Sequence, residues 1–278
     1  MAPTIQRHPV ATFFVLAFAI TWVVWVPRAA ASQGLLASDL PIVVGQVWSW
    51  GPAIAALLAA SLTGGRAAVR ELGARLVRWR VGRQWYLVVL VGPAAFSFVV
   101  AGLYTLLLGG SWSAAAPQAF DRGVLALVPI FVVLALTDGM GEEVGWRGYA
   151  LPRLLARHSA LGASLLLGVL WALWHLPLFW TEGYPLYQSP IWLLFVDLPA
   201  QAIIYTWIFQ HTRGSVLLAI LLHAAGNLFA LPQATIHGDL TLSVLEVGAK
   251  GLVALVVVAV AGPRYLARGP RPEALSRV

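Results

Sequence analysis

The sequence predicts an all-α, polytopic membrane protein with about eight transmembrane helices and an amphipathic cytoplasmic helix. Of its 278 residues, 60% are hydrophobic and only 10% are charged, whereas a soluble domain usually carries roughly 25% charged residues. The apolar residues also form long blocks of the length that crosses the hydrocarbon as a helix, about 20 residues. These blocks do not alternate apolar with polar positions and are too long for barrel strands.

Eight apolar blocks follow one another along the chain, and we expect a helix in each. They cover residues 10–27, 41–62, 85–108, 123–140, 161–180, 190–210, 214–231 and 243–262. The first block has an alternative interpretation as a signal peptide, since Arg7 precedes it and small residues resembling a cleavage site follow it. Its apolar run is longer than a signal core, so we expect a retained helix. Residues 1–278 are expected to form a single membrane domain.

The distribution of positive charge predicts the orientation. Of the 18 cations, 17 are arginines, and 15 fall on the side of the N-terminus when all eight blocks cross. Because cytoplasmic loops are enriched in Lys and Arg, this asymmetry predicts a cell-membrane protein with both termini inside. The preference for Arg over Lys is typical of a GC-rich, bacterial genome.

The net charge of +7 points to membrane lipid rather than nucleic acid, because the cations lie between the apolar blocks. Residues 66–80 carry apolar side chains at helical spacing, with arginines on the other face. This pattern predicts an amphipathic helix on the cytoplasmic leaflet. The chain has no Cys, which excludes disulfides, thiolate nucleophiles and Cys-ligated metals.

Three polar clusters lie in or beside the apolar blocks, where ionisable groups usually serve a function. The first contains Glu142, Glu143 and Arg147, where the fourth block meets the cytoplasmic side. Glu143 and Arg147 stand at i,i+4 and can form an ion pair. Glu142 lies about 100° further round the helix, which leaves its carboxylate free to act as a base. The alternative is an interfacial charge cluster that ends the span.

The other clusters pair polar residues at i,i+4 within the fifth and seventh blocks. Trp171 and His175 share one helix face, and so do His223 and Asn227. Polar packing between helices would explain either pair alone. Together with Glu142 they could form one buried cavity suited to hydrolysis, with a carboxylate base for water and donors for an oxyanion. Asp138 and Asp197 are expected to pair with a cation or shape this cavity.

The three motifs resemble those of a known family. Glu-Glu-x-x-x-Arg at 142–147, Trp-x-x-x-His at 171–175 and His-x-x-x-Asn at 223–227 are similar, in that order, to the motifs of the CPBP (CAAX protease and bacteriocin-processing, or ABI) intramembrane proteases, which include the type II CAAX prenyl endopeptidases. The resemblance covers roughly residues 125–231, the expected catalytic core. It implies an intramembrane endopeptidase that hydrolyses a peptide bond of a membrane-associated protein or peptide, of the prenylated CAAX type or a bacterial counterpart.

The resemblance also assigns roles to the motif residues. Glu142 and His175 would activate a water molecule, and His223 and Asn227 would form the oxyanion hole. Glu143 and Arg147 would support the site. Trp171 stands where the family usually has Phe, so we expect a changed pocket shape at that position.

The family is often labelled as metalloproteases, and Glu142, His175 and His223 would be the ligands if zinc were bound. The sequence lacks the His-Glu-x-x-His spacing of a zinc helix, and Asn227 suits an oxyanion donor better than a metal ligand. Glutamate catalysis without a cofactor is therefore the favoured hypothesis. Two other functions stay open: a non-catalytic bacteriocin-immunity or scaffold protein of the same fold, and a proton channel or transporter with an intramembrane relay.

Overall fold

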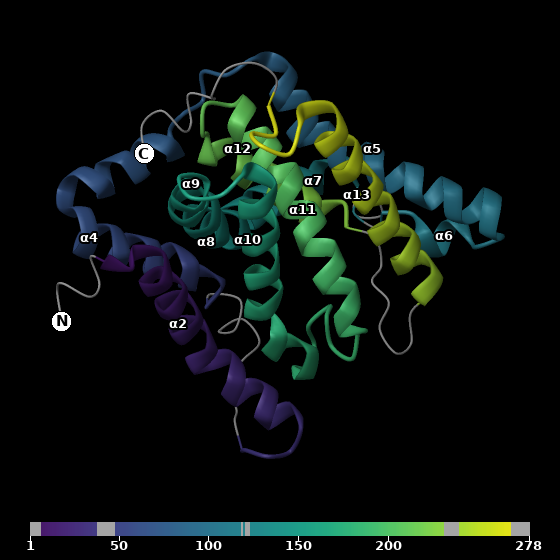
Figure 1. Ribbon diagram of the computed structural model, residues 1–278. Coiled ribbons are helices and arrows are strands. Elements are labelled where there is room, and N and C mark those ends of the chain that lie inside the picture. The colour runs from purple at the N-terminus through teal and green to yellow at the C-terminus, as the bar shows by residue number, and fades with distance from the viewer. Residues whose placement is uncertain (1–6, 38–47, 118, 120–122, 231–238, 268–278) are drawn as a thin grey trace.

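The structure is a computed structural model that describes residues 7–37, 48–117, 119, 123–230 and 239–267, and within these ranges every regular element is helical (Figure 1). The elements are α2 (Pro9–Ser32), η1 (Trp48–Trp50), α4 (Gly51–Leu76), α5 (Arg83–Leu108), α6 (Trp112–Ala115), α7 (Val124–Leu134), η3 (Ala135–Gly139), α8 (Met140–Glu143), η4 (Val144–Ala150), α9 (Leu151–Leu155), α10 (Ala160–Trp174), η5 (Leu176–Trp180), α11 (Ile191–His211), α12 (Val216–Leu228) and α13 (Leu240–Ala261).

The all-α, multi-pass architecture is confirmed, with one difference in the number of long helices. Seven helical stretches in the described part of the chain are long and apolar enough to cross a membrane. The expected span 214–231 is helical only over Val216–Leu228, which is about 20 Å long at 1.5 Å per residue and therefore shorter than the hydrocarbon. Residues 41–47 of the second block, Arg122 and the arginines after residue 267 lie outside the described residues.

The fourth span differs from the prediction in a way that determines the site. It does not end at residue 140, because α7, η3, α8, η4 and α9 join into one apolar helical stretch that runs to Leu155. We refer to residues 124–155 as the motif helix. Glu142 and Glu143 lie inside it rather than at its end, and both are buried. A helix can continue past such carboxylates when neighbouring protein groups pair with them, as they do here.

Close packing against α4 holds the motif helix in place. A Cβ atom on Gly145 would lie 2.5 Å from the Cβ atom of Pro52 in α4, so only a glycine allows this approach. This glycine thus lets the two helices touch. On the same side, Phe13 of α2 packs edge-on against Trp146, with ring centroids 5.6 Å apart.

The amphipathic segment predicted for residues 66–80 begins at a kink in α4. Gly65 has φ +58°, a backbone conformation that residues with a Cβ atom rarely adopt, and it divides α4 into an apolar part and an arginine-rich part. The helix ends at Leu76 rather than at residue 80. In Figure 1, α10 and α11 lie in the centre of the molecule, between α2 and α4 on one side and α13 on the other.

Candidate active site

The motif helix is wider than an α-helix on both sides of its two glutamates. Residues Ala135–Gly139 and Val144–Ala150 are π-helical and flank the short α-helical turn Met140–Glu143. Such π-helical insertions are rare and occur frequently at functional sites. Both glutamates approach His223 of α12, but at different ring nitrogens: Oε1 of Glu143 lies 2.8 Å from Nδ1, and Oε1 of Glu142 lies 3.9 Å from Nε2. The expected role of Glu142 as a base stays a prediction.

A buried ionic network is centred on Glu143. Its Oε1 accepts from Arg147 at 2.8 Å and from Nδ1 of His223 at 2.8 Å. Glu143 and Arg147 are both 0% exposed. The guanidinium of Arg147 also contacts two aromatic rings, with its Cζ atom 4.3 Å from the ring centre of Trp171 and 4.0 Å from that of Tyr205. The ion pair expected from the i,i+4 spacing is therefore present.

Hydrogen bonds from two indoles hold the Glu142 carboxylate. Its Oε2 accepts from Nε1 of Trp146 at 3.1 Å and from Nε1 of Trp171 at 2.5 Å. Its other oxygen, Oε1, lies 3.9 Å from Nε2 of His223. This separation suits a bridging water molecule that lies about 2.8 Å, an ordinary hydrogen-bond distance, from each of the two atoms. Glu142 therefore has one oxygen fixed by the protein and one directed toward a histidine.

Trp171 is the common neighbour of the polar residues. Besides its bond to Glu142, its ring centre lies 6.0 Å from that of His223 and 6.2 Å from that of His175. His175 is at the C-terminal end of α10, where Pro177 follows and the chain continues as the 3-10 helix η5. Nδ1 of His175 lies 2.9 Å from the carbonyl of Trp171. A carbonyl only accepts, so Nδ1 carries a proton and Nε2 keeps a lone pair in the neutral ring.

Asn227 and Asp138 form a second polar pair, next to the network around Glu143. Asn227 lies one helical turn beyond His223 on α12 and donates from Nδ2 to Oδ2 of Asp138 at 3.2 Å. Asn227 is exposed, unlike His223. Asp197 is elsewhere, paired with Lys250 of α13 at 2.7 Å. The structure thus brings Glu142, Glu143, Arg147, His223 and Trp171 into direct contact, and places His175 and Asn227 at the margins of this group.

Two residues of the site had no place in the sequence prediction. Trp146 donates to Glu142, and its position four residues after Glu142 was a signal that could have identified it. Tyr205 covers the Arg147 guanidinium from α11. No spacing within the sequence signals that contact, because it depends on how α11 packs against the motif helix.

The histidines and glutamates of this site do not form a zinc-ligand set. Among the described residues, no group of three or more His, Cys, Asp or Glu side chains has an arrangement that could hold a metal ion. Nδ1 of His223 is bonded to Glu143 and Nδ1 of His175 to a carbonyl, which leaves Nε2 of each ring as its only possible ligand atom. Three convergent ligands are the minimum for a catalytic zinc site. We therefore assign no step of the chemistry to a metal.

Comparison with known proteins confirms the family resemblance for the centre of the chain. Residues 124–229 match the sequence model of the family described as Type II CAAX prenyl endopeptidase Rce1-like. The chain is also similar to CAAX prenyl protease 2 of Methanococcus maripaludis, with 35% identity over 141 residues, or 47% of this chain and 49% of that protein. The chain thus matches about half the length of this curated relative. The matched family segment contains all three motifs.

Proposed function

We propose that the protein is an intramembrane endopeptidase that hydrolyses a peptide bond near the C-terminus of a membrane-associated protein or peptide. The observation that carries this proposal is the position of Glu142, a buried carboxylate whose Oε1 lies 3.9 Å from Nε2 of His223. The family match over residues 124–229 supports the same reaction. The name of the Methanococcus relative suggests that the substrate carries a prenyl group at a C-terminal CAAX sequence.

In the proposed reaction, Glu142 takes a proton from a water molecule that attacks the scissile carbonyl. The same carboxyl group then returns the proton to the leaving amine, as general acid–base catalysis requires. The two indole donors to Oε2 keep Oε1 directed at the water. His175, with Nε2 unprotonated in the neutral ring, assists in orienting the water.

His223 is proposed to stabilise the oxyanion of the tetrahedral intermediate. Its Nδ1 donates to Glu143, which fixes the ring so that Nε2 points toward Glu142. When the imidazole is protonated, Nε2 also donates, and the carboxylate of Glu143 balances its charge. Asn227 would supply a further donor if substrate binding releases it from Asp138. Arg147 neutralises Glu143 and keeps this arrangement in place.

For the orientation we propose that both termini are cytoplasmic in a bacterial cell membrane, as the arginine distribution predicts. In this orientation the arginine-rich part of α4 and the C-terminal end of the motif helix lie on the cytoplasmic side. A peptide substrate that is anchored in the inner leaflet would reach Glu142 from there.

The proposal is tested by incubating the purified protein in nanodiscs with two C-terminal CAAX peptides, one farnesylated and one unmodified. We expect cleavage of the farnesylated peptide, and no loss of rate after strict chelation of divalent metals. Loss of activity that only added zinc restores would overturn the metal-independent mechanism. If neither peptide is cleaved although the protein is shown to be folded, the result counts against the CAAX substrate.

The replacement Trp171→Phe separates the indole hydrogen bond from the shape of the pocket. A hydrogen bond to a charged group is worth about 1.5–3 kcal/mol, and Trp146 still holds the same oxygen of Glu142. We therefore expect kcat to fall about 10-fold with little change in KM. Trp174→Phe is the matched control, because Trp174 is also fully buried but its Nε1 has no hydrogen-bond partner among the described residues. Equal losses of kcat in the two variants would contradict the positioning role of Trp171.

A further inference from the structure

A cleft of about 380 Å³ separates the arginine-rich part of α4 from the C-terminal end of the motif helix. It lies at the opposite end of η4 from Glu142. Its walls are formed by small and apolar residues together with a few charged ones: Gly64, Ala67, Ala68, Glu71, Leu72, Arg75, Gly148, Tyr149, Pro152 and Arg153. The cleft thus has two walls from helices that are remote in sequence, and two arginines, one from each wall.

Arg75 is the more deeply buried of these arginines, and its hydrogen bonds are incomplete. It is 6% exposed, and its Nη2 donates to Oε1 of Glu71 at 3.1 Å. Its Nη1 is buried without a hydrogen-bond partner in the described part of the chain. A buried donor of a charged group that lacks an acceptor destabilises the folded state. Because Arg75 lines the cleft, an acceptor bound there would satisfy it.

Arg153 brings a second positive charge to the same cleft. Its Nη1 donates to the carbonyl of Tyr149 at 2.9 Å, and its Cζ atom lies 3.6 Å from the centre of the Tyr149 ring. No carboxylate of the described residues forms an ion pair with Arg153. The two guanidiniums are close enough to repel each other, and Glu71 is the only acidic residue of the lining. The cleft therefore carries an excess of one positive charge.

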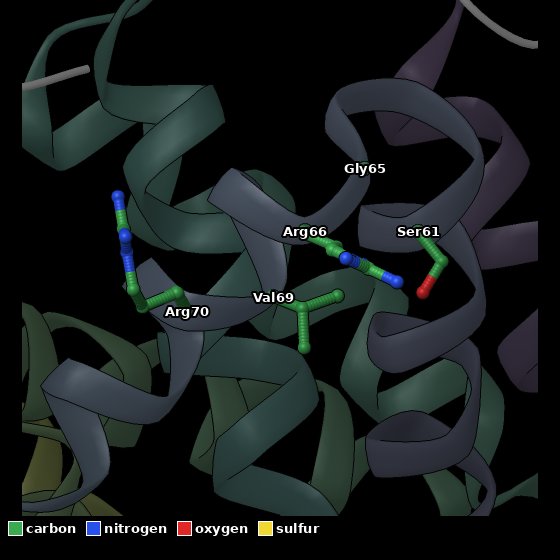
Figure 2. A pocket seen from close by; sticks show the side chains of 5 residues that line it. All are labelled: Ser61, Gly65, Arg66, Val69 and Arg70. Atoms are coloured by element: carbon green, nitrogen blue, oxygen red, sulfur yellow. The ribbon is translucent and has the colours of Figure 1, made fainter.

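A neighbouring hollow adds further positive charge along the same helix. Figure 2 shows it at the Gly65 kink, with the guanidinium of Arg66 extending toward Ser61 and Arg70 pointing away on the other side of Val69. Arg66 and Arg70 are both exposed. Arginine forks match the oxygens of a phosphate group, and clusters of them beside a membrane bind anionic headgroups.

We propose that this cleft binds a phosphate group, held by Arg75 of α4 and Arg153 of the motif helix. A bound phosphate would accept from the unsatisfied Nη1 of Arg75, neutralise the excess charge and join two helices that both contact the site. Its source is either the headgroup of an anionic phospholipid or phosphate in solution. This inference concerns the stability of the fold and does not depend on the proposed peptidase activity.

The test measures the thermal unfolding midpoint of the full chain by tryptophan fluorescence, in nanodiscs of phosphatidylcholine with and without phosphatidylglycerol. Binding to the folded state raises the midpoint, and we expect a rise of roughly 2–4 °C. In Arg75→Gln and in Arg153→Gln this rise should disappear. Arg153→Lys should retain part of it, and Arg264→Gln, which changes an exposed arginine outside the cleft, should retain all of it.

The controls distinguish the source of the phosphate and exclude a general salt effect. If inorganic phosphate added to phosphatidylcholine nanodiscs reproduces the rise in an Arg75- and Arg153-dependent way, the site takes free phosphate. If chloride at equal ionic strength raises the midpoint as much, the proposal is overturned. It is also overturned if the midpoints of the Gln variants rise like that of the unmodified chain. Should Arg75→Gln not fold, Arg153→Gln alone decides, since Arg153 is only partly buried.

Discussion

Replacement of Arg147 by Met should lower the free energy of unfolding by about 3–5 kcal/mol, the usual cost of removing one partner from a buried ion pair. The reason is that Glu143, which is 0% exposed, would keep its charge with only His223 beside it. The aromatic rings of Trp171 and Tyr205 would also lose the cation that contacts them. Thermal unfolding in detergent, followed by tryptophan fluorescence, should show a midpoint lower by on the order of 10 °C.

The double variant Glu143→Gln/Arg147→Met provides the control for this prediction. It removes both charges, so no uncompensated carboxylate stays in the interior, and it should be more stable than Arg147→Met alone. The pair Glu71–Arg75 is a less suitable comparison, because its Glu71 side chain is 45% exposed although Arg75 is buried. A loss below about 1 kcal/mol in Arg147→Met, as for an exposed pair, would show that the network around Glu143 does not hold the motif helix.

Features that depend on local helical spacing could be predicted from the sequence. The ion pair of Glu143 with Arg147 follows from their i,i+4 separation, and the apolar blocks identify the long helices because their length matches the hydrocarbon. The family resemblance was predictable as well, since its three motifs occur in order on apolar segments. Each of these signals is local, since every single motif spans only a few neighbouring residues.

Features that depend on the register between helices could not be predicted. The bond from His223 to Glu143 joins residues 80 positions apart, and no spacing along the chain reports it. The π-helical turns on either side of the two glutamates are another feature that no sequence pattern indicated. The end of the motif helix was misplaced because isolated carboxylates suggest a membrane boundary, whereas here they are paired inside the protein.

The role of Trp171 illustrates how one substitution changes the type of interaction. The larger ring predicts a changed pocket shape, but the structure shows an indole N–H that donates to the Glu142 carboxylate at 2.5 Å. A phenylalanine at this position has no such donor. The larger size of Trp compared with Phe is evident from the sequence. The direction of the indole N–H depends on how α10 packs against the motif helix.

The largest effect on activity is expected for Glu142→Gln. The amide has nearly the same shape and its oxygen still accepts from Trp146 and Trp171, so the fold should be retained. It cannot take a proton from water, and the loss of a general base lowers rates by about 100-fold to 10,000-fold. Glu182→Gln is the matched control, because Glu182 is an exposed glutamate of the connection between η5 and α11.

The most direct test of the account is the cleavage rate of a farnesylated CAAX peptide by Glu142→Gln, measured beside Glu182→Gln in the same nanodiscs and corrected for the folded fraction. The account predicts that Glu142→Gln unfolds at the midpoint of the unmodified chain but cleaves at least about 100-fold more slowly, while Glu182→Gln keeps the full rate. If folded Glu142→Gln cleaves at the rate of the control, Glu142 is not the base that activates water.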